Sequence, residues 1–351
     1  MASSTELSRT MRAAVFDGHD PCLSLRRMPI PEPGPGAVRI AVAACGVCRT
    51  DLHVIDGELP TPKPALIPGH EIIGYVDALG AGVRDLRLGM RVGVPWLGHT
   101  CGHCRYCLDG HENLCDAAAF HGYTRDGGYA DYVVAESAYC FRIPDAYDDV
   151  EAAPLMCAGL IGYRSLRMAG AARRVGIYGF GAAAHIVTQI AVSEGRRVFA
   201  FTRADDDRAR QLARDVGAEW AGSSDDPAPE RLDAALIFAP AGYLVPRALE
   251  AVDKGGIVIC GGIHMSDIPA FPYRLLWEER RLVSVANLTR ADGIGLMRAA
   301  TRTRLHVHAT PYPLEDANVA LADLRAGRIA GAAVLRVSGD GMSTRDAPPA
   351  P

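Results

Sequence analysis

The sequence predicts an α/β protein in which an irregular β-rich domain is joined to a doubly wound parallel sheet. In the first third of the chain, short β-branched runs alternate with glycine and proline, a pattern typical of strands separated by turns. After about Cys157 the pattern changes to apolar strands alternating with helical stretches. The 351 residues are enough for two separate hydrophobic cores.

Apolar runs bounded by turn residues predict the strands of the β-rich part. The segment Pro31–Gly36 (Pro-Glu-Pro-Gly-Pro-Gly) predicts a turn, because proline is excluded from helix interiors. The expected strands are Ala13–Phe16, Val38–Ala43, Ile72–Ala78, Arg91–Val94 and Tyr129–Val134.

In the second part, a strand at Arg174–Tyr178 runs into the turn Gly179–Gly181, and a helix with apolar residues at helical spacing follows. Asp205 is the expected N-cap of the next helix, which ends at Val216. This alternation predicts a Rossmann-type sheet. The further expected strands are Val198–Phe201, Leu232–Phe238, Ile257–Cys260 and Leu282–Val285.

Composition narrows the class of protein. Apolar residues make up 49% and charged residues 22% of the chain, and the net charge is −4, so neither a membrane nor a nucleic acid is the expected partner. The first ten residues lack the pattern of a secretory signal. The ten cysteines favour metal ligation over a disulfide framework, and hence a reducing compartment, the cytoplasm.

The most specific motif is a cluster of four cysteines, separated by two, two and seven residues. Four thiolates can surround one tetrahedral zinc ion and leave no open position, so the expected site is structural. An iron–sulfur cluster is the rival interpretation, but its usual fourth cysteine follows after three residues and precedes proline. Two disulfides, or a chance grouping of cysteines, would also produce such a cluster. The motif consists of Cys101, Cys104, Cys107 and Cys115.

Three further short motifs carry information only in combination. They are Cys48-Arg-Thr-Asp-Leu-His53, Pro68-Gly-His-Glu71 and Met156-Cys-Ala-Gly159. Together with the four-cysteine lobe, they make the chain resemble the zinc-dependent alcohol dehydrogenases of the medium-chain dehydrogenase/reductase superfamily. The resemblance extends from about Arg12 to Leu335 and implies that the β-rich domain is of the GroES-like type.

The resemblance also implies a catalytic zinc ion, and therefore two zinc ions per chain. Its ligands would be Cys48, His70 and Cys157, with Glu71 behind the metal; Cys45 does not match the ligand position. Two thiolates and one imidazole leave the fourth position open for substrate, as a catalytic zinc requires. Asp51 would then orient the imidazole of His70.

The family reaction is hydride exchange between a primary alcohol or aldehyde and a nicotinamide dinucleotide. Zinc would polarise the substrate oxygen. Thr50 would pass the proton through the nicotinamide ribose to His53, whose unperturbed pKa of about 6.5 suits the task. By the same resemblance Arg49 reaches the pyrophosphate, and Trp96 lines the substrate pocket. Without the metal ligands, the stretch from Thr50 to His53 would be an ordinary polar loop.

The nucleotide site is predicted from the residues themselves. Gly179, Gly181 and Ala184 follow a strand and open a helix, so the phosphates would meet the helix N-terminus. The next strand ends in Thr202-Arg203, where an NAD enzyme usually has an acidic residue. NADP(H) is therefore favoured, although the three aspartates from Asp205 to Asp207 keep NAD(H) possible.

The expected domains are residues 1–157 with the zinc lobe at 96–116, the cofactor domain at 158–292, a return to the catalytic domain at 293–337, and a disordered tail at 338–351. A zinc-free enone or quinone reductase and a non-catalytic dinucleotide-binding protein are the alternative functions. The zinc motifs argue against the first, and Thr50 with His53 against the second. Relatives pair near the strand Leu282–Val285, so a homodimer or homotetramer is expected.

Overall fold

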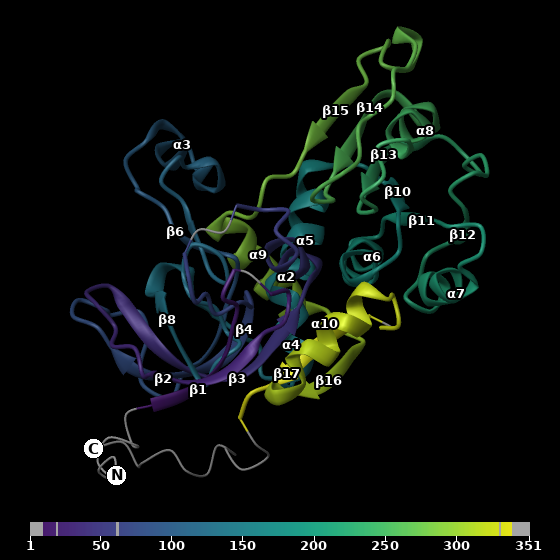
Figure 1. The fold of residues 1–351 in the computed structure, drawn as a ribbon. Coiled ribbons are helices and arrows are strands. Elements are labelled where there is room, and N and C mark those ends of the chain that lie inside the picture. Colours follow the sequence, from purple (N-terminus) through teal and green to yellow (C-terminus); the bar gives the residue numbers. More distant parts are fainter. Residues whose placement is uncertain (1–9, 19, 61–62, 330, 339–351) are drawn as a thin grey trace, which may run out of the picture. The chain divides into compact units, whose positions relative to one another are not determined.

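The computed structural model describes residues 10–18, 20–60, 63–329 and 331–338 and consists of two compact units (Figure 1). The first unit comprises residues 1–157, 289–297 and 308–351, and the second comprises residues 158–288 and 298–307. Apart from Ser338, the tail predicted from the sequence lies outside the described residues, as does the start of the chain up to residue 9.

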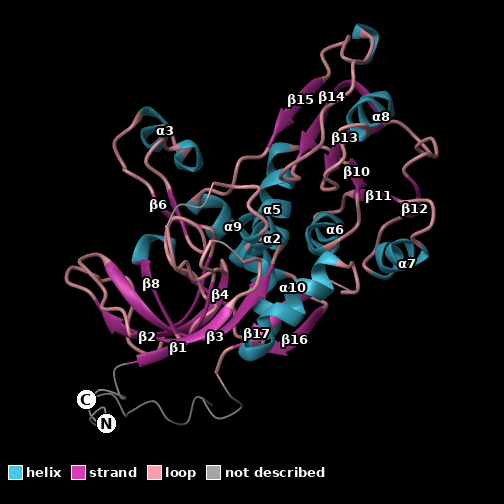
Figure 2. Cartoon of the chain, viewed as in Figure 1, coloured by secondary structure: helices cyan, strands magenta, loops and turns pink. Residues whose placement is uncertain are grey.

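The first unit is rich in strands, with short helices at their ends (Figure 2). Helix α9 (Arg290–Arg302) begins in this unit and ends in the second. The strands of the first unit are β1 (Thr10–Val15), β2 (Ser24–Pro29), β3 (Ala37–Val47), β4 (Glu71–Leu79), β5 (Arg91–Val94), β6 (Leu97–His99), β7 (Ala119–Phe120), β8 (Tyr132–Glu136), β9 (Phe141–Arg142), β16 (Ala309–Pro313) and β17 (Ala332–Arg336). Its helices are α2 (Arg49–Ile55), α3 (Arg105–Leu108), η1 (Glu112–Leu114), η2 (Ser137–Tyr139), α4 (Asp149–Ala152), η3 (Ala153–Met156), η5 (Leu314–Asp316) and α10 (Ala317–Arg325).

Strand β3 organises the first unit because it pairs antiparallel with β4, β8 and β17. Its neighbours extend the sheet in the order β16-β17-β3-β4-β5-β9. Apolar side chains from these strands, such as Ile40, Ile72 and Val92, are fully buried in the core of the unit. In Figure 1 the lobe that carries α3 extends away from this sheet.

The register of β3 and β4 brings distant parts of the sequence together. Gly46, near the end of β3, pairs with Glu71, the first residue of β4. Because the strands are antiparallel, the residue after β3 and the residue before β4 lie at the same edge of the sheet. These residues are Cys48, one position beyond Val47, and His70.

The second unit is a parallel sheet covered by helices (Figure 2). The strand order is β12-β11-β10-β13-β14-β15, and each neighbouring pair is parallel. The strands are β10 (Arg174–Tyr178), β11 (Arg197–Thr202), β12 (Trp220–Ser223), β13 (Leu232–Ile237), β14 (Val252–Cys260) and β15 (Arg281–Ser284). The helices are α5 (Ala158–Met168), α6 (Ala182–Ser193), α7 (Asp207–Asp215), α8 (Leu244–Ala251) and η4 (Tyr273–Leu275).

The predicted fold class, a β-rich domain with a doubly wound parallel sheet, is confirmed. Some local predictions were wrong, and two of them concern an N-cap and the start of a strand. The N-cap of α7 is Asp206, whose carboxylate accepts the Ala209 backbone N–H at 2.9 Å, rather than Asp205. The segment from Tyr129 joins a strand only at Tyr132, because its first residues form only an isolated bridge to β1 at Ala130, while the Tyr129 N–H bonds to the loop at Pro68. None of the helices in the described part of the chain has the length and apolar character needed to cross a membrane.

Candidate active site

Four potential metal ligands converge at the edge of the β3–β4 sheet. One ligand atom each from Cys48, His70, Glu71 and Cys157 lies within 4.8 Å of all the others. The Sγ atoms of Cys48 and Cys157 are 3.8 Å apart. His70 is fully buried, and its Nε2 has no hydrogen-bond partner among the described residues. A buried nitrogen of this kind is costly unless something binds it.

A buried carboxylate connects two of these ligands. Asp51 is 1% exposed, and its Oδ1 accepts a hydrogen bond at 3.1 Å from Nδ1 of His70. Its Oδ2 accepts the backbone N–H of Cys48 at 2.8 Å, which also closes the first turn of α2. The bond to Nδ1 directs the other ring nitrogen of His70 toward the two thiols.

The pKa shifts of the cluster are those of a site that can hold a cation. Contact with the Cys157 thiol and with His70 lowers the pKa of Cys48 well below its usual value, although burial opposes this shift. The same thiol contact and burial raise the pKa of Cys157. Burial and the nearby Cys48 raise the pKa of the Glu71 carboxyl. The groups cannot all take their anionic form unless a cation compensates them, so the donor set fits a zinc ion.

Helix α2 carries the residues predicted for the proton path. Thr50 is 8% exposed, and its Oγ1 lies 3.9 Å from Sγ of Cys48. His53 is three residues further on, with its side chain 16% exposed and Nδ1 in contact with the Glu58 carboxylate. Arg49 is exposed at the first turn of the helix.

A second cluster of ligand atoms lies in the lobe around α3. The side chains of Cys101, Cys104, Cys107 and Cys115 have their sulfur atoms within 4.8 Å of one another. The Sγ atoms of Cys101 and Cys107 are 4.0 Å apart, close to the roughly 3.8 Å expected for two sulfurs bound to one tetrahedral zinc at about 2.3 Å. Backbone N–H groups of His103 and Cys104 lower the pKa of Cys101 to about 6, which favours the thiolate form.

The disulfide alternative is not supported by this geometry. All ten cysteines are within the described residues, and all have free thiols. A sulfur–sulfur distance of 4.0 Å is about twice that of a disulfide bond. The lobe is tied to α9 by Glu112, a buried carboxylate that accepts the Arg290 backbone N–H at 2.9 Å and its Nε at 3.2 Å.

In the second unit, the glycine turn predicted for the nucleotide lies at the carboxyl end of β10. Gly179 has φ +86°, and a Cβ at this position would stand 2.7 Å from the Cβ of Ala239. Gly181 is the N-cap of α6, and apart from its two chain neighbours no described residue has an atom within 4 Å of the place where its Cβ would be. Ala184 is fully buried in the first turn of the helix. A helix N-terminus reached through small residues is suited to a pyrophosphate.

The end of β11 is less open than the sequence predicts. Thr202 is 3% exposed, and its hydroxyl faces the backbone carbonyls of Arg203 at 3.0 Å and Gly222 at 3.3 Å. The Arg203 side chain is 77% exposed, with Asp205 and Asp206 at 3.9 and 3.6 Å. Arg210, which the sequence analysis did not single out, donates to the Arg203 carbonyl at 2.9 Å.

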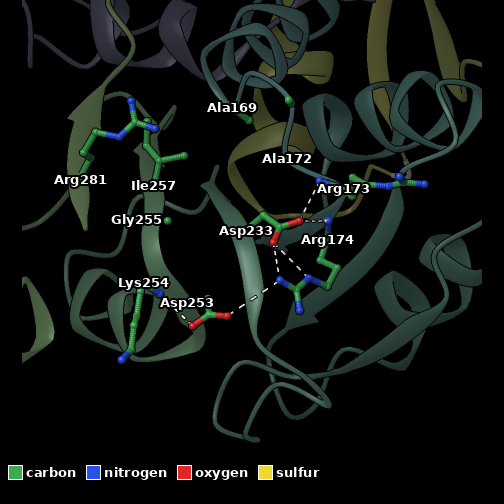
Figure 3. A pocket seen from close by; sticks show the side chains of 12 residues that line it. Ala169, Ala172, Arg173, Arg174, Asp233, Asp253, Lys254, Gly255, Ile257 and Arg281 are labelled. Carbon is green, nitrogen blue, oxygen red and sulfur yellow. Dashed lines mark hydrogen bonds and ion pairs between the residues drawn. The ribbon is translucent and has the colours of Figure 1, made fainter. Parts of the chain in front are cut away.

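A pocket of about 500 Å³ lies at the opposite edge of the same sheet. It is lined by residues at the amino ends of β10, β13, β14 and β15 (Figure 3). Asp233 there accepts the backbone N–H groups of Arg173 and Arg174 and the guanidinium of Arg174. Figure 3 shows Arg173 and Arg281 on opposite sides of this pocket. Because nucleotides bind at the carboxyl ends of parallel strands, this pocket is not the cofactor site.

Comparison with known proteins decides the family. Residues 34–145 match the family model of the alcohol dehydrogenase GroES-like domain. The chain is 46% identical to a probable alcohol dehydrogenase from Mycobacterium tuberculosis over 88% of this chain and 91% of that protein. It is 35% identical to an alcohol dehydrogenase from Geobacillus stearothermophilus, over 94% of this chain and all of that one. The chain belongs to the zinc-type alcohol dehydrogenases of the medium-chain dehydrogenase/reductase superfamily.

A solved structure supports the same assignment. The cobalt- and zinc-bound thermostable alcohol dehydrogenase from Pyrobaculum aerophilum matches this dehydrogenase with a TM-score of 0.85 and 26% identity, covering 93% of this chain and 100% of that one. The family resemblance drawn from the sequence is therefore confirmed. Family membership also favours the alcohol dehydrogenase over the two alternative classes considered for the sequence.

Part of the surroundings of the potential metal ligands was not predicted from the sequence. The Trp96 ring lies edge-on to His70, with centroids 5.0 Å apart, and stacks on Phe120 at 5.3 Å and on Tyr123 at 5.7 Å. Trp96 was predicted as a pocket residue, whereas the other two rings were not. They are brought close to Trp96 by the pairing of β6 with β7. These strands are too short to be predicted from the sequence.

Proposed function

We propose that this alcohol dehydrogenase holds a catalytic zinc ion on Cys48, His70 and Cys157, with Glu71 as an additional carboxylate behind it. The observation that carries the proposal is the buried Nε2 of His70, which has no hydrogen-bond partner in the described part of the chain and lies beside two thiols. When bound, zinc would act as a Lewis acid on the oxygen of an alcohol or aldehyde. We also assign a second, structural zinc ion to Cys101, Cys104, Cys107 and Cys115.

The residues of α2 then handle the proton. Thr50, next to the Cys48 sulfur, would take the proton of the alcohol. The proton would then pass through the ribose of the bound nucleotide to His53, partly exposed one turn later, which would release it to solvent. The Glu58 carboxylate at Nδ1 of His53 would hold the ring in place. Arg49, exposed beside them, is assigned to the pyrophosphate.

We further propose a primary alcohol or aldehyde as substrate. The stack of Trp96, Phe120 and Tyr123 beside His70 supports an apolar and narrow pocket, which would disfavour a branched carbon next to the reacting oxygen.

For the nucleotide we propose NADP(H), bound by the turn at Gly179, Gly181 and Ala184. Since the Thr202 hydroxyl faces backbone carbonyls, recognition of a 2′-phosphate would fall mainly to Arg203. The aspartates beside Arg203 keep NAD(H) as the alternative.

We also propose that the dehydrogenase forms a homodimer or homotetramer in the cytoplasm. Support for self-association comes from β15, an edge strand of the parallel sheet, since an open edge is available for pairing. Free thiols on all ten cysteines suit a reducing compartment. Light scattering should give two or four times the subunit mass of 37.4 kDa, and a mass equal to one subunit would contradict this proposal.

One experiment tests the main proposal. Purified protein would be analysed for metal and then assayed with a panel of primary and secondary alcohols and their carbonyl products, using both nucleotides. We expect two zinc ions per chain and the highest kcat/KM for primary substrates. A protein that turns over these substrates without any metal would refute the catalytic zinc.

A further inference from the structure

The loop before β4 is held by a second segment that is distant in sequence. The backbone N–H of Gly127 donates to the Ile67 carbonyl at 2.7 Å, and those of Gly128 and Tyr129 donate to the carbonyls of Gly69 and Pro68 at 3.0 Å each. A Cβ on Gly127 would stand 2.0 Å from the Gly69 oxygen. The close approach therefore requires glycine, and it fixes the backbone immediately before His70.

This pairing brings the Tyr129 side chain close to Asp51, the carboxylate that bonds to His70 and Cys48. The ring is fully buried, and it passes so close to Gly69 that a Cβ there would stand 2.3 Å from a ring carbon. The Tyr129 hydroxyl reaches Oδ2 of Asp51 at 3.1 Å. Tyrosine is protonated at neutral pH, so the hydroxyl donates this hydrogen bond.

The described residues donate four hydrogen bonds to the Asp51 carboxylate, and Tyr129 supplies one of them. Oδ1 accepts from His70 and from the Gly69 backbone N–H at 3.2 Å, while Oδ2 accepts from the Cys48 backbone N–H and from Tyr129. A carboxylate buried this deeply is stable only if its oxygens are bonded. Because the two oxygens form one rigid group, a donor on Oδ2 also limits the rotation of Oδ1 against the imidazole of His70.

We propose that Tyr129 is a positioning residue for the catalytic metal site, acting through Asp51 to fix the orientation of His70 and the position of Cys48. This inference rests on the proposed function, because that proposal assigns zinc to these two ligands. The ring alone would pack equally well as phenylalanine, so the hydroxyl is the part of Tyr129 that serves the site.

The test compares Tyr129→Phe with Tyr312→Phe in the full-length protein. Tyr312 is the matched control, since its hydroxyl also donates to a carboxylate, Asp323, at 2.8 Å. Zinc release to an excess of chelator would be followed over time, and Cys48→Ala would identify the phase that belongs to the catalytic site. Tyr129→Phe should speed this phase about tenfold, which is the lower end of the change in metal affinity seen when a residue that supports a metal ligand is replaced. The release of zinc from the four-cysteine lobe should stay unchanged. Tyr312→Phe should change neither.

A spectroscopic measurement separates positioning from general destabilisation. Cobalt(II) substituted into the site that Cys48→Ala removes would report ligand geometry through its visible absorption, and we expect Tyr129→Phe to shift these bands. In a double-mutant cycle, Asp51→Asn and Tyr129→Phe should be non-additive in release rate, because both act on the same hydrogen bond.

The outcomes are distinct. If Cys48→Ala holds as much zinc as the wild type, no zinc ion depends on Cys48. The proposed function is then wrong, and so is the inference that rests on it. If the wild type has this ion but Tyr129→Phe matches Tyr312→Phe in release rate and cobalt spectrum, only the inference is wrong. Equal acceleration of both release phases, or additive effects with Asp51→Asn, would also overturn it, since the role of Tyr129 would then be structural or independent of Asp51.

Discussion

Gly46 lies directly against the Glu71 side chain. A Cβ at position 46 would stand 1.9 Å from Oε2 of Glu71 and 2.8 Å from its Cβ. Since the two residues are paired in the β3–β4 ladder, neither backbone can move without disturbing the sheet. The absence of a side chain at position 46 therefore leaves room for the Glu71 carboxylate near Cys48 and Cys157.

The variant Gly46→Ala should displace Glu71 from the site. Overpacking of this kind costs about 1–3 kcal/mol in the free energy of unfolding, and turnover should fall as well because the carboxylate borders the metal ligands. Urea unfolding and steady-state kinetics would measure the two effects. Gly34→Ala is the control, because nothing lies within 4 Å of its Cβ position; equal behaviour of the two variants would contradict the prediction.

The two cysteine clusters should have separable roles. Cys48→Ala should lower turnover by at least about 1,000-fold, since Lewis-acid polarisation supplies several kcal/mol, while the protein stays folded. Cys107→Ala should lower Tm by at least about 5 °C, because a closed zinc site stabilises a lobe that has little core of its own. Metal analysis should find one zinc ion left in each variant. An unaltered Tm for Cys107→Ala would contradict the assignment of a structural role to the second cluster.

Within the proton path, Thr50→Ala should lose more turnover than His53→Ala. Thr50 is buried beside the Cys48 sulfur, so water cannot easily replace its hydroxyl, and a loss of about 10²–10⁴-fold is expected. His53 is partly exposed, and solvent can take over part of its role, which limits the loss to about tenfold. Single-turnover kinetics at pH 7 would compare the two. A greater loss for His53→Ala would show that the path is assigned wrongly.

The sequence was informative where ligands have fixed spacing and uninformative where contacts depend on strand register. Cys101 to Cys115 lie in one short lobe, so their spacing alone predicts a cluster. Tyr129 reaches Asp51 across 78 positions, and Gly46 meets Glu71 only through the pairing of β3 with β4. No local periodicity encodes such contacts, which is why both were missed.

Local backbone chemistry explains the smaller differences. Strand β14 begins at Val252 rather than at the predicted Ile257, although Gly255 has φ +68°. The ladder extends beyond the two adjacent glycines to Val252, which pairs with Leu232 across a register shift. Asp205 and Asp206 are adjacent aspartates, so the predicted N-cap differs from the observed one by a single position.

His121 should make stability depend on pH. It is fully buried, its Nδ1 donates to the Pro95 carbonyl at 3.0 Å, and burial lowers its pKa to about 4. The unfolded chain takes up this proton near pH 6.5, whereas the folded protein does so only near pH 4. The contribution of His121 to stability is therefore complete above pH 6.5 and is lost progressively as the pH falls toward 4.

Between pH 7 and pH 5 this loss should amount to about 2 kcal/mol in the free energy of unfolding. Urea unfolding at both pH values, with zinc in excess, would measure it. His121→Gln should reduce the pH dependence by that amount, whereas the exposed control His306→Gln should leave it unchanged. If His121→Gln keeps the full dependence, other groups are responsible.

The cofactor prediction depends on Arg203. A guanidinium about 4 Å from a phosphate gains roughly 4 kcal/mol of Coulomb energy at an effective dielectric constant of 20. Because Arg203 is 77% exposed and has two aspartates nearby, screening should reduce this to about 1 kcal/mol, or a fewfold to tenfold preference for NADPH over NADH. Arg203→Ile alone should abolish the preference, since the Thr202 hydroxyl faces backbone carbonyls.

Adding Thr202→Asp should then reverse the preference in favour of NADH. A carboxylate at the end of β11 can accept hydrogen bonds from a free ribose and repels a 2′-phosphate. Arg210, 3.4 Å from the Thr202 oxygen, would partly offset the charge of this carboxylate in the folded protein. The measurement is kcat/KM for NADPH and NADH on one aldehyde in the wild type, the single and the double variant. Arg173→Ile, at the opposite edge of the sheet, is the control. A wild type that prefers NADH would refute the cofactor assignment, whereas an NADPH preference that survives Arg203→Ile would refute only the residue.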